Sequence, residues 1–164
     1  MKKMKTYHVQ NRPNREILDS MEIQQILKNG KFAVISMCRG DEPYIVTLSY
    51  GYDIENNTLF FHCSPQGLKV DFIKSNPNVC ATIIEDGGYI TNECGHNYRT
   101  VVFWGKMEFV QNVEEKRYGM EILLKHLETD PVIMKEKAMK SEGFYSRMEV
   151  LKLTITQIHG KVGR

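Results

Sequence analysis

The chain has 164 residues, of which 26% are charged, and its formal net charge at pH 7 is only +2. A chain of this length can bury a sizeable core without metals or disulfides, so residues 1–164 are expected to form a single domain. The balanced charge argues against a nucleic-acid-binding protein, which would carry a strongly basic face.

The first thirteen residues contain no long apolar stretch and are expected to form a flexible arm. No later run approaches the length needed to cross a membrane, so neither a membrane nor nucleic acid is expected as a partner. A cytoplasmic location is the expectation that follows.

A capping-box pattern predicts the first helix, from Ser20 to about Asn29. Asp19 is followed three residues later by Glu22, and Gly30 can end the helix. Its apolar face would comprise Met21, Ile23, Ile26 and Leu27.

Three short strands are predicted to follow as an antiparallel meander. They cover Phe32 to Cys38, Tyr44 to Tyr50 and Thr58 to Cys63, and the turns RGDEP and DIENNT separate them. The second and third strands are therefore expected to lie side by side.

The segment Leu59 to Lys74, LFFHCSPQGLKVDFIK, runs from an apolar strand through a polar turn into a helix. Ser64 is expected to cap this helix, with Pro65 at its first position. The free amides of the first turn and the helix dipole would favour an anion such as a phosphate. An ordinary strand, cap and amphipathic helix without a ligand is the alternative.

Three side chains of this segment could complete an anion site. His62 and Ser64 can hydrogen bond to a phosphate, and Lys69 can reach back as a point charge from the next turn. Gly67 would let a ligand approach the backbone closely.

The second half of the chain predicts more strands and two helices. A capping box at Asn112 and Glu115 indicates a helix that ends near His126, and Asp130 with Pro131 can start another. Strands are predicted for Val79 to Glu85, Tyr98 to Val110 and Met148 to His159, and a polar loop for Asp86 to Asn97.

About six strands with peripheral helices make the predicted fold mainly β, within the α+β class. A small closed or split antiparallel barrel is favoured, because closure removes exposed sheet edges.

The four cysteines, at positions 38, 63, 80 and 94, include no CxxC pair, and the first three lie in apolar runs. They are expected to be reduced and mostly buried. Cys94 and His96 form a CGH triplet, but two possible ligands do not make a zinc site, so no metal is expected.

Several familiar chemistries lack their defining motifs, because the chain contains no GxGxxG, GxxxxGKS/T, GxSxG or HExxH. A flavin needs none of them. It needs an anion site for its phosphate, an apolar slot for its ring, and backbone amides or a cation near the polar edge of the ring. The strand of Thr47 and Ser49 could offer its backbone to such a ring, although a solvated strand is the alternative.

Five separated blocks of the chain, in order, are NREILDSMEIQQIL, PYIVTLSYGYD, LFFHCSPQGLKVDFI, NPNVCATI and YRTVVFWGKMEFVQNVEEK. This series resembles the flavin-binding split-barrel family related to pyridoxamine 5′-phosphate oxidase, and within it the nitroimidazole-resistance branch. The similarity covers Asn14 to Lys125, and its specificity comes from the order of the blocks.

The resemblance implies a six-stranded antiparallel split β-barrel that forms a homodimer. FMN, with FAD as the alternative, would bind in two equivalent sites at the subunit interface. In similar proteins the positions of His62, Ser64 and Lys69 hold the flavin phosphate. His62 is also the candidate catalytic residue, and whether it faces phosphate or substrate stays open.

The resemblance further implies that the strand of Val46, Thr47 and Leu48 runs along the flavin ring. Thr47 stands where the family usually has proline, and Thr100 stands where it usually has serine. These two departures leave the ring contacts and the substrate preference open.

The block YRTVVFWG is expected to reach the flavin of the other subunit, through Tyr98, Arg99 and Trp104. Trp104 could stack on the ring, and Arg99 could supply positive charge. Simple dimer packing is the alternative for all three, since aromatic residues and arginine are enriched at interfaces.

The function expected from this resemblance is that of an FMN-dependent oxidoreductase. It would pass electrons from a reduced small-molecule donor to a small acceptor such as a nitro compound. A flavin carrier or redox sensor without turnover is the second hypothesis. A haem-binding split barrel is the third, with His62, His96 and His159 as candidate axial ligands.

Overall fold

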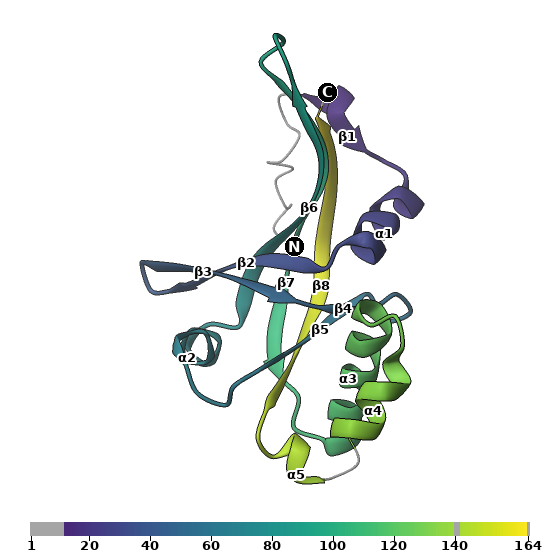
Figure 1. The fold of residues 1–164 in the computed structure, drawn as a ribbon. Helices are drawn as coiled ribbons and strands as arrows, with labels where there is room; N and C mark the ends of the chain where they lie inside the picture. The colour runs from purple at the N-terminus through teal and green to yellow at the C-terminus, as the bar shows by residue number, and fades with distance from the viewer. Residues whose placement is uncertain (1–11, 140–141, 164) are drawn as a thin grey trace.

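The computed structural model describes residues 12–139 and 142–163, and its strands form one antiparallel sheet (Figure 1). Within this sheet the order is β3-β2-β6-β7-β8-β5-β4, and β1 pairs with β8 outside that path. The strands are β1 (Glu16–Ile17), β2 (Phe32–Arg39), β3 (Glu42–Ser49), β4 (Gly51–Asp53), β5 (Thr58–Cys63), β6 (Asn78–Ile90), β7 (Gly95–Phe109) and β8 (Glu149–Gly163). The helices are the short 3-10 helix η1 (Pro13–Arg15), α1 (Ser20–Asn29), α2 (Leu68–Ser75), α3 (Val113–Leu127), α4 (Pro131–Ala138) and α5 (Glu142–Tyr145).

The sheet closes into a barrel because its two ends belong to one stretch of chain. Strand β3 ends at Ser49 and β4 begins at Gly51, so only Tyr50 separates the first strand of the order from the last. Tyr50 is fully buried and its hydroxyl donates to the carbonyl of Leu27 at 2.7 Å. The predicted split antiparallel barrel is confirmed, with six strands of six or more residues and two short ones, β1 and β4.

The predicted first helix is confirmed at both ends. The side chain of Asp19 accepts a hydrogen bond from the amide of Met21 at 2.9 Å, as an N-cap residue does. Gly30 caps the other end, but its φ is −62°, so it is not in a left-handed conformation. A Cβ on Gly30 would lie 2.5 Å from the Tyr50 hydroxyl oxygen, so close packing requires glycine here.

The core fills the barrel with alternate side chains of the long strands. Among the largest fully buried side chains are Ile35, Phe61, Phe72, Phe103 and Leu153. Helix α2 packs against β2 and β3, and α3 packs against β4 and β5, with α4 and α5 against α3 (Figure 1). Within the described part of the chain, no helix combines the length and the apolar character that a membrane span requires.

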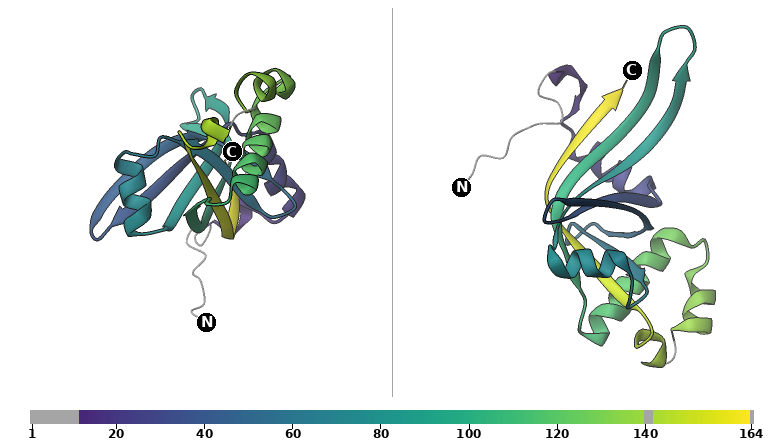
Figure 2. Two further views of the ribbon diagram at one scale, coloured as in Figure 1. Left: turned by 90° about the horizontal axis from the view of Figure 1, so that it is seen from below. Right: turned by 90° about the vertical axis from the view of Figure 1, so that its left-hand side faces the viewer.

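The expected polar loop from Asp86 to Asn97 is mostly strand instead. Strand β6 continues to Ile90 and β7 starts at Gly95, so the two form a long hairpin that projects beyond the rest of the barrel (Figure 2). The register between β6 and β7 shifts between Asp86 and Tyr89, and this shift marks a β-bulge. Glycines and polar residues are typical of loops, but here they serve the bulge and the solvated faces of a hairpin.

The predicted flexible arm falls largely outside this structure, because residues 1–11 are not among those described. Pro13, its last residue, already belongs to η1.

Candidate functional site

Strands β3 and β5 part at a defined point of the barrel wall. The last pair joining this stretch of chain to β5 is Gly51 with Phe60. Continued further, the same register would place Ser49 opposite His62 and Thr47 opposite Ser64, but the described residues contain no such pairing. We call this place, bounded by Val46–Ser49 on β3 and residues 61–64 at the end of β5, the strand split.

Among the residues that the structure describes, the strand split leaves two backbone edges unpaired, one on β3 and one at the end of β5. Strand β3 pairs with β2 on its other side, and β5 pairs with β8 on its other side. Amide and carbonyl groups on the free edges are strong hydrogen-bonding groups without a strand partner. They can therefore bind the polar edge of a planar ligand.

The predicted ring-contact residues of β3 do not all point the same way. Val46 and Leu48 are half-buried and pack on the barrel core, whereas Thr47 is exposed on the opposite face. Only Thr47 can offer its side chain to a ligand outside the barrel. Val46 and Leu48 can contribute backbone groups.

The end of β5 places His62 and Lys69 on the other side of the strand split. His62 is exposed between the buried Phe61 and Cys63. Burial raises the pKa of the Cys63 thiol, and the nearby positive charge of Lys69 opposes that rise. Lys69 therefore lies close to the end of β5, as the anion-site hypothesis requires.

The helix after β5 begins later than the sequence indicated. Ser64 was expected to cap it and Pro65 to start it, but α2 begins at Leu68 and its N-cap is Gly67. Gly67 has φ +136°, a conformation that favours glycine. Pro65 instead lies in a turn, where the Ser64 hydroxyl accepts a 3.4 Å hydrogen bond from the amide of Gln66.

Even with this later helix start, the proposed anion-binding groups lie within one short segment of the chain, residues 62–69. The amides of Val70 and Asp71 both bond to the carbonyl of Gly67, so Leu68 and Lys69 are the helical residues whose amides precede the first intrahelical bonds. The exposed Ser64 hydroxyl stands in the turn before them. These groups suit a phosphate at the end of β5.

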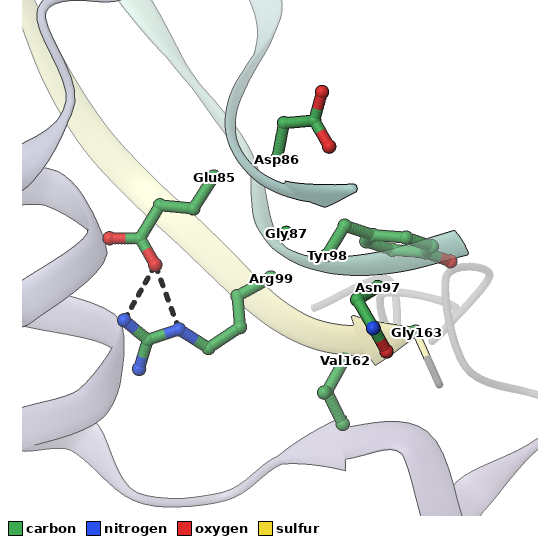
Figure 3. A pocket seen from close by; sticks show the side chains of 8 residues that line it. All are labelled: Glu85, Asp86, Gly87, Asn97, Tyr98, Arg99, Val162 and Gly163. Atoms are coloured by element: carbon green, nitrogen blue, oxygen red, sulfur yellow. Dashed lines mark hydrogen bonds and ion pairs between the residues drawn. The ribbon is translucent and has the colours of Figure 1, made fainter. Parts of the chain in front are cut away.

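The three predicted contacts from β7 are divided between two faces of the sheet. Tyr98 and Trp104 occupy even positions and Arg99 an odd one, so Arg99 points to the opposite side. Its guanidinium lies 2.6 Å from Glu85 and 3.2 Å from Glu22, and the bond to Glu85 raises the pKa of Arg99 (Figure 3). Within one chain, the structure therefore does not bring Arg99 to the groups of the strand split.

The outer face of the barrel carries apolar side chains that the sequence analysis did not single out. Phe32, Ile45 and Ile84 are 61%, 63% and 59% exposed. They flank a row that crosses five strands through Thr47, Val34, Thr82, Val102 and His159. The near-continuous apolar runs FAVISMC and VCATII were the available signal, since a strand that is apolar on both faces is covered on both.

Trp104 lies on this outer face and contacts His159. Their rings meet edge to face with centroids 6.1 Å apart. His159 also contacts Gln157 and lies 4.0 Å from a carboxylate oxygen of Glu16. Among the predicted haem ligands, His159 is thus half-buried, whereas His62 is exposed and His96 is bonded to Asp86 at 2.7 Å.

All four cysteines are free thiols. Cys63 is buried, Cys38 and Cys80 are half-buried, and Cys94 is exposed. Of the three cysteines in apolar runs, which were expected to be mostly buried, one is thus buried and two are half-buried. In residues 12–139 and 142–163, no three His, Cys, Asp or Glu side chains gather as metal ligands do.

A family described as pyridoxamine 5′-phosphate oxidase matches residues 19–162 of the chain. A curated relative, an uncharacterised protein of Rhizobium meliloti, is 35% identical over 69 residues, which are 42% of this chain and 44% of that protein. The chain thus matches less than half the length of this relative.

Solved structures share the fold over nearly the whole chain. A candidate 5-nitroimidazole antibiotic resistance protein from Bacteroides thetaiotaomicron has a TM-score of 0.78 and 26% identity, over 90% of this chain and 86% of that one. An FAD- and haem-binding protein from Mycobacterium smegmatis has a TM-score of 0.77 and 15% identity, over 92% and 74% of the two chains. An FAD-binding protein from Mesorhizobium loti has a TM-score of 0.64 and 19% identity, over 88% and 95%. The last two similarities, at such low identity, describe the fold alone.

Proposed function

Because the chain belongs to the pyridoxamine 5′-phosphate oxidase family, we propose that it binds FMN at the strand split and is a flavin-dependent oxidoreductase. It takes electrons from a reduced small-molecule donor and passes them to a small acceptor such as a nitro compound. The observation that carries this proposal is the parting of β3 from β5 beyond Gly51 and Phe60. It leaves free backbone edges beside His62, Ser64 and Lys69.

The residues of the strand split fit the two ends of FMN. The free edge of β3 at Thr47 offers amide and carbonyl groups to the polar edge of the ring. Ser64, Lys69 and the first amides of α2 offer a hydroxyl, a charge and a helix N-terminus to the phosphate. A single phosphate matches this single cluster, which favours FMN over FAD.

The flavin, when bound, supplies the redox chemistry. The protein holds the ring, orients it and excludes water from one side of it. His62 lies where it can serve either the phosphate or the acceptor, and it is the candidate catalytic residue. No step here calls for a hydrolytic acid–base pair.

A homodimer completes the site in this proposal. Exposed apolar side chains on the outer face, among them Phe32, Ile45 and Ile84, favour a second copy of the chain as their cover. A partner subunit would then close the strand split from outside and bring its own Tyr98 and Trp104 toward the flavin. Arg99 is expected to stay with Glu22 and Glu85, in keeping with simple packing.

The visible absorbance spectrum of the purified protein, followed by chromatography of the released cofactor, tests the proposal. A flavin spectrum with FMN released supports it, and a protein that takes up no flavin contradicts it. An intense haem band would favour the haem-binding alternative. A yellow dimer that does not oxidise NAD(P)H with nitroaromatic, quinone or ferric acceptors would favour the flavin carrier.

A further inference from the structure

A cavity of about 300 Å³ lies on the outer face at the base of the β6–β7 hairpin. It is lined by Ile84, Asp86, His96, Tyr98 and Thr100. These residues occupy alternate positions of two paired strands, and they share the outer face with Trp104. The CGH triplet that the sequence brought out contributes its histidine to this wall.

The imidazole of His96 is held in place by the Asp86 carboxylate, which lies at the turn before Gly88. Its Nε2 lies 2.7 Å from Oδ1 of Asp86, and the same oxygen accepts a 2.7 Å hydrogen bond from the amide of Gly88. Gly88 has φ +90° within the bulge that ends at Tyr89. The bulge therefore fixes the carboxylate, and the carboxylate fixes the histidine.

One nitrogen of His96 remains for a ligand. The hydrogen bond from His96 lowers the pKa of Asp86, so its carboxylate is charged near neutral pH and only accepts. Nε2 is then the donor to Asp86, which leaves Nδ1 without a hydrogen-bond partner among residues 12–139 and 142–163. Nδ1 accepts from a ligand N–H when the ring is neutral and donates to a ligand oxygen when the ring is charged.

The other walls of the cavity are the bonded Thr100 hydroxyl, the Ile84 side chain and the Tyr98 phenol. The Thr100 hydroxyl is 2.9 Å from the carbonyl of Ile83 and 2.9 Å from the hydroxyl of Thr82, so it has no hydrogen to spare. Ile84 is 59% exposed and Tyr98 is half-buried. Figure 3 shows the Asp86 carboxylate turned away from the Arg99 guanidinium. Arg99 therefore does not compete with His96 for this carboxylate.

The cavity shares the outer face with the strand split. Ser49 pairs with Phe32, and Val34 pairs with Thr82, so Phe32 and Ile84 each lie two residues beyond the last β2–β6 pair, on the same outer face. Ile84 is therefore at least two strand spacings from Ser49, about 10 Å or more. A ligand in the cavity would share this face, which the proposed dimer covers, with a flavin held at the edge of β3.

We propose that this cavity binds the electron-accepting substrate, as a small planar heteroaromatic ring against Ile84 and Tyr98 with a hydrogen bond to Nδ1 of His96. The proposal rests on the proposed function, because it assigns the acceptor of the same flavin site. The volume of the cavity is at the low end of the range for ligand pockets, roughly 300–1,000 Å³, and this suits a ligand with a single ring. Asp86 is a positioning residue that acts through His96.

The test titrates 2-methyl-5-nitroimidazole into the purified dimer with its flavin, by equilibrium dialysis. This probe carries both an N–H and a nitro group, so it can meet Nδ1 in either protonation state. His96→Ala is expected to weaken its binding about 3- to 10-fold, the range for one lost hydrogen bond. Asn97→Ala, the next residue along and on the opposite face, is the matched control with unchanged affinity.

A second measurement separates positioning from packing. Nitrogen NMR of the His96 ring is expected to show one dominant tautomer in the unaltered protein and a mixture in Asp86→Asn, whose amide can also donate. Flavin absorbance, recorded on every sample, is expected to be the same in all variants.

Equal affinity in His96→Ala and the unaltered protein overturns the inference, and so does the lack of saturable probe binding. An equal loss in Asn97→Ala overturns it too. With normal flavin content, any of these results leaves the proposed function standing. Absence of flavin from the unaltered protein would instead contradict the proposed function.

Discussion

Lys69 stands in the first turn of α2, next to the end of β5. If it contacts the flavin phosphate, Lys69→Ala should weaken FMN binding by about 1–3 kcal/mol, through loss of a charge-assisted hydrogen bond. Quenching of FMN fluorescence during titration measures this. Lys74→Ala on the same helix is the control, since its ammonium lies over the Phe109 ring at 5.9 Å. Equal affinities of both variants would remove Lys69 from the site.

His62 has two possible tasks that one variant separates. If the imidazole faces the phosphate, His62→Ala should lower flavin occupancy by the loss of one hydrogen bond, about 1 kcal/mol. If the imidazole faces the acceptor, the flavin occupancy of the variant should be unchanged, and its turnover at saturating flavin should fall. Absorbance of the bound flavin and steady-state NAD(P)H oxidation, measured on the same samples, give the two quantities. A variant with both unchanged would exclude His62 from the site.

Helix α3 is tied to the end of α1 through His126. Its Nε2 lies 2.6 Å from the carbonyl of Gly30, and its ring packs on Tyr50 with centroids 4.8 Å apart. Burial lowers the pKa of His126, so the folded protein favours the neutral ring. The unfolded chain therefore binds more protons as the pH falls below its ordinary pKa of about 6.5, and stability must decrease there.

Urea unfolding at pH 7.5 and 5.5, with equal saturating FMN, tests this linkage. The free energy of unfolding should be lower at pH 5.5 for the unaltered protein. His126→Gln keeps a donor for the Gly30 carbonyl but does not titrate, so its decrease over the same interval should be smaller. The same pH dependence in both proteins would place the effect on other groups.

Most of the elements could be predicted from local signals. The N-cap residues Asp19 and Asn112 start α1 and α3, and both side chains accept from the amides that a cap serves. Strand β5 has the bounds that its apolar run and the turn residues around it gave it. Local hydrogen bonding decides such features, so sequence suffices for them.

The predictions that were wrong concern segments where a local signal competes with a tertiary demand. Ser64 and Pro65 look like a helix start, but α2 begins only after Gly67 turns the chain toward β2 and β3. Gly87 and Gly88 look like loop residues, but pairing with β7 extends β6 through them. In both places a glycine reshapes the path of the backbone rather than ending an element.

At the scale of the whole molecule, the sequence could not reveal which distant groups meet. Nothing in the sequence indicates a partner for the Arg99 guanidinium. In the structure it bonds to Glu85 and also to Glu22, which is 77 positions away. The strand split likewise has no signal in the sequence. It arises because β4 pairs with β5, whereas β3, one residue earlier in the chain, does not pair with β5. Both features depend on barrel closure, so they need the three-dimensional structure.

Barrel closure also decides which apolar side chains are left outside, and Ile45 tests their role. It is 63% exposed on β3 in the single chain, so Ile45→Glu should leave the fold intact. In a homodimer that covers this face, the buried charge should split the dimer and release FMN, because each site loses the partner that closes it. Light scattering after size exclusion and flavin absorbance measure the two effects. Leu18→Glu, 84% exposed and outside the sheet, is the control that should remain a yellow dimer. If Ile45→Glu also remains one, the outer face of β3 is not where the subunits meet.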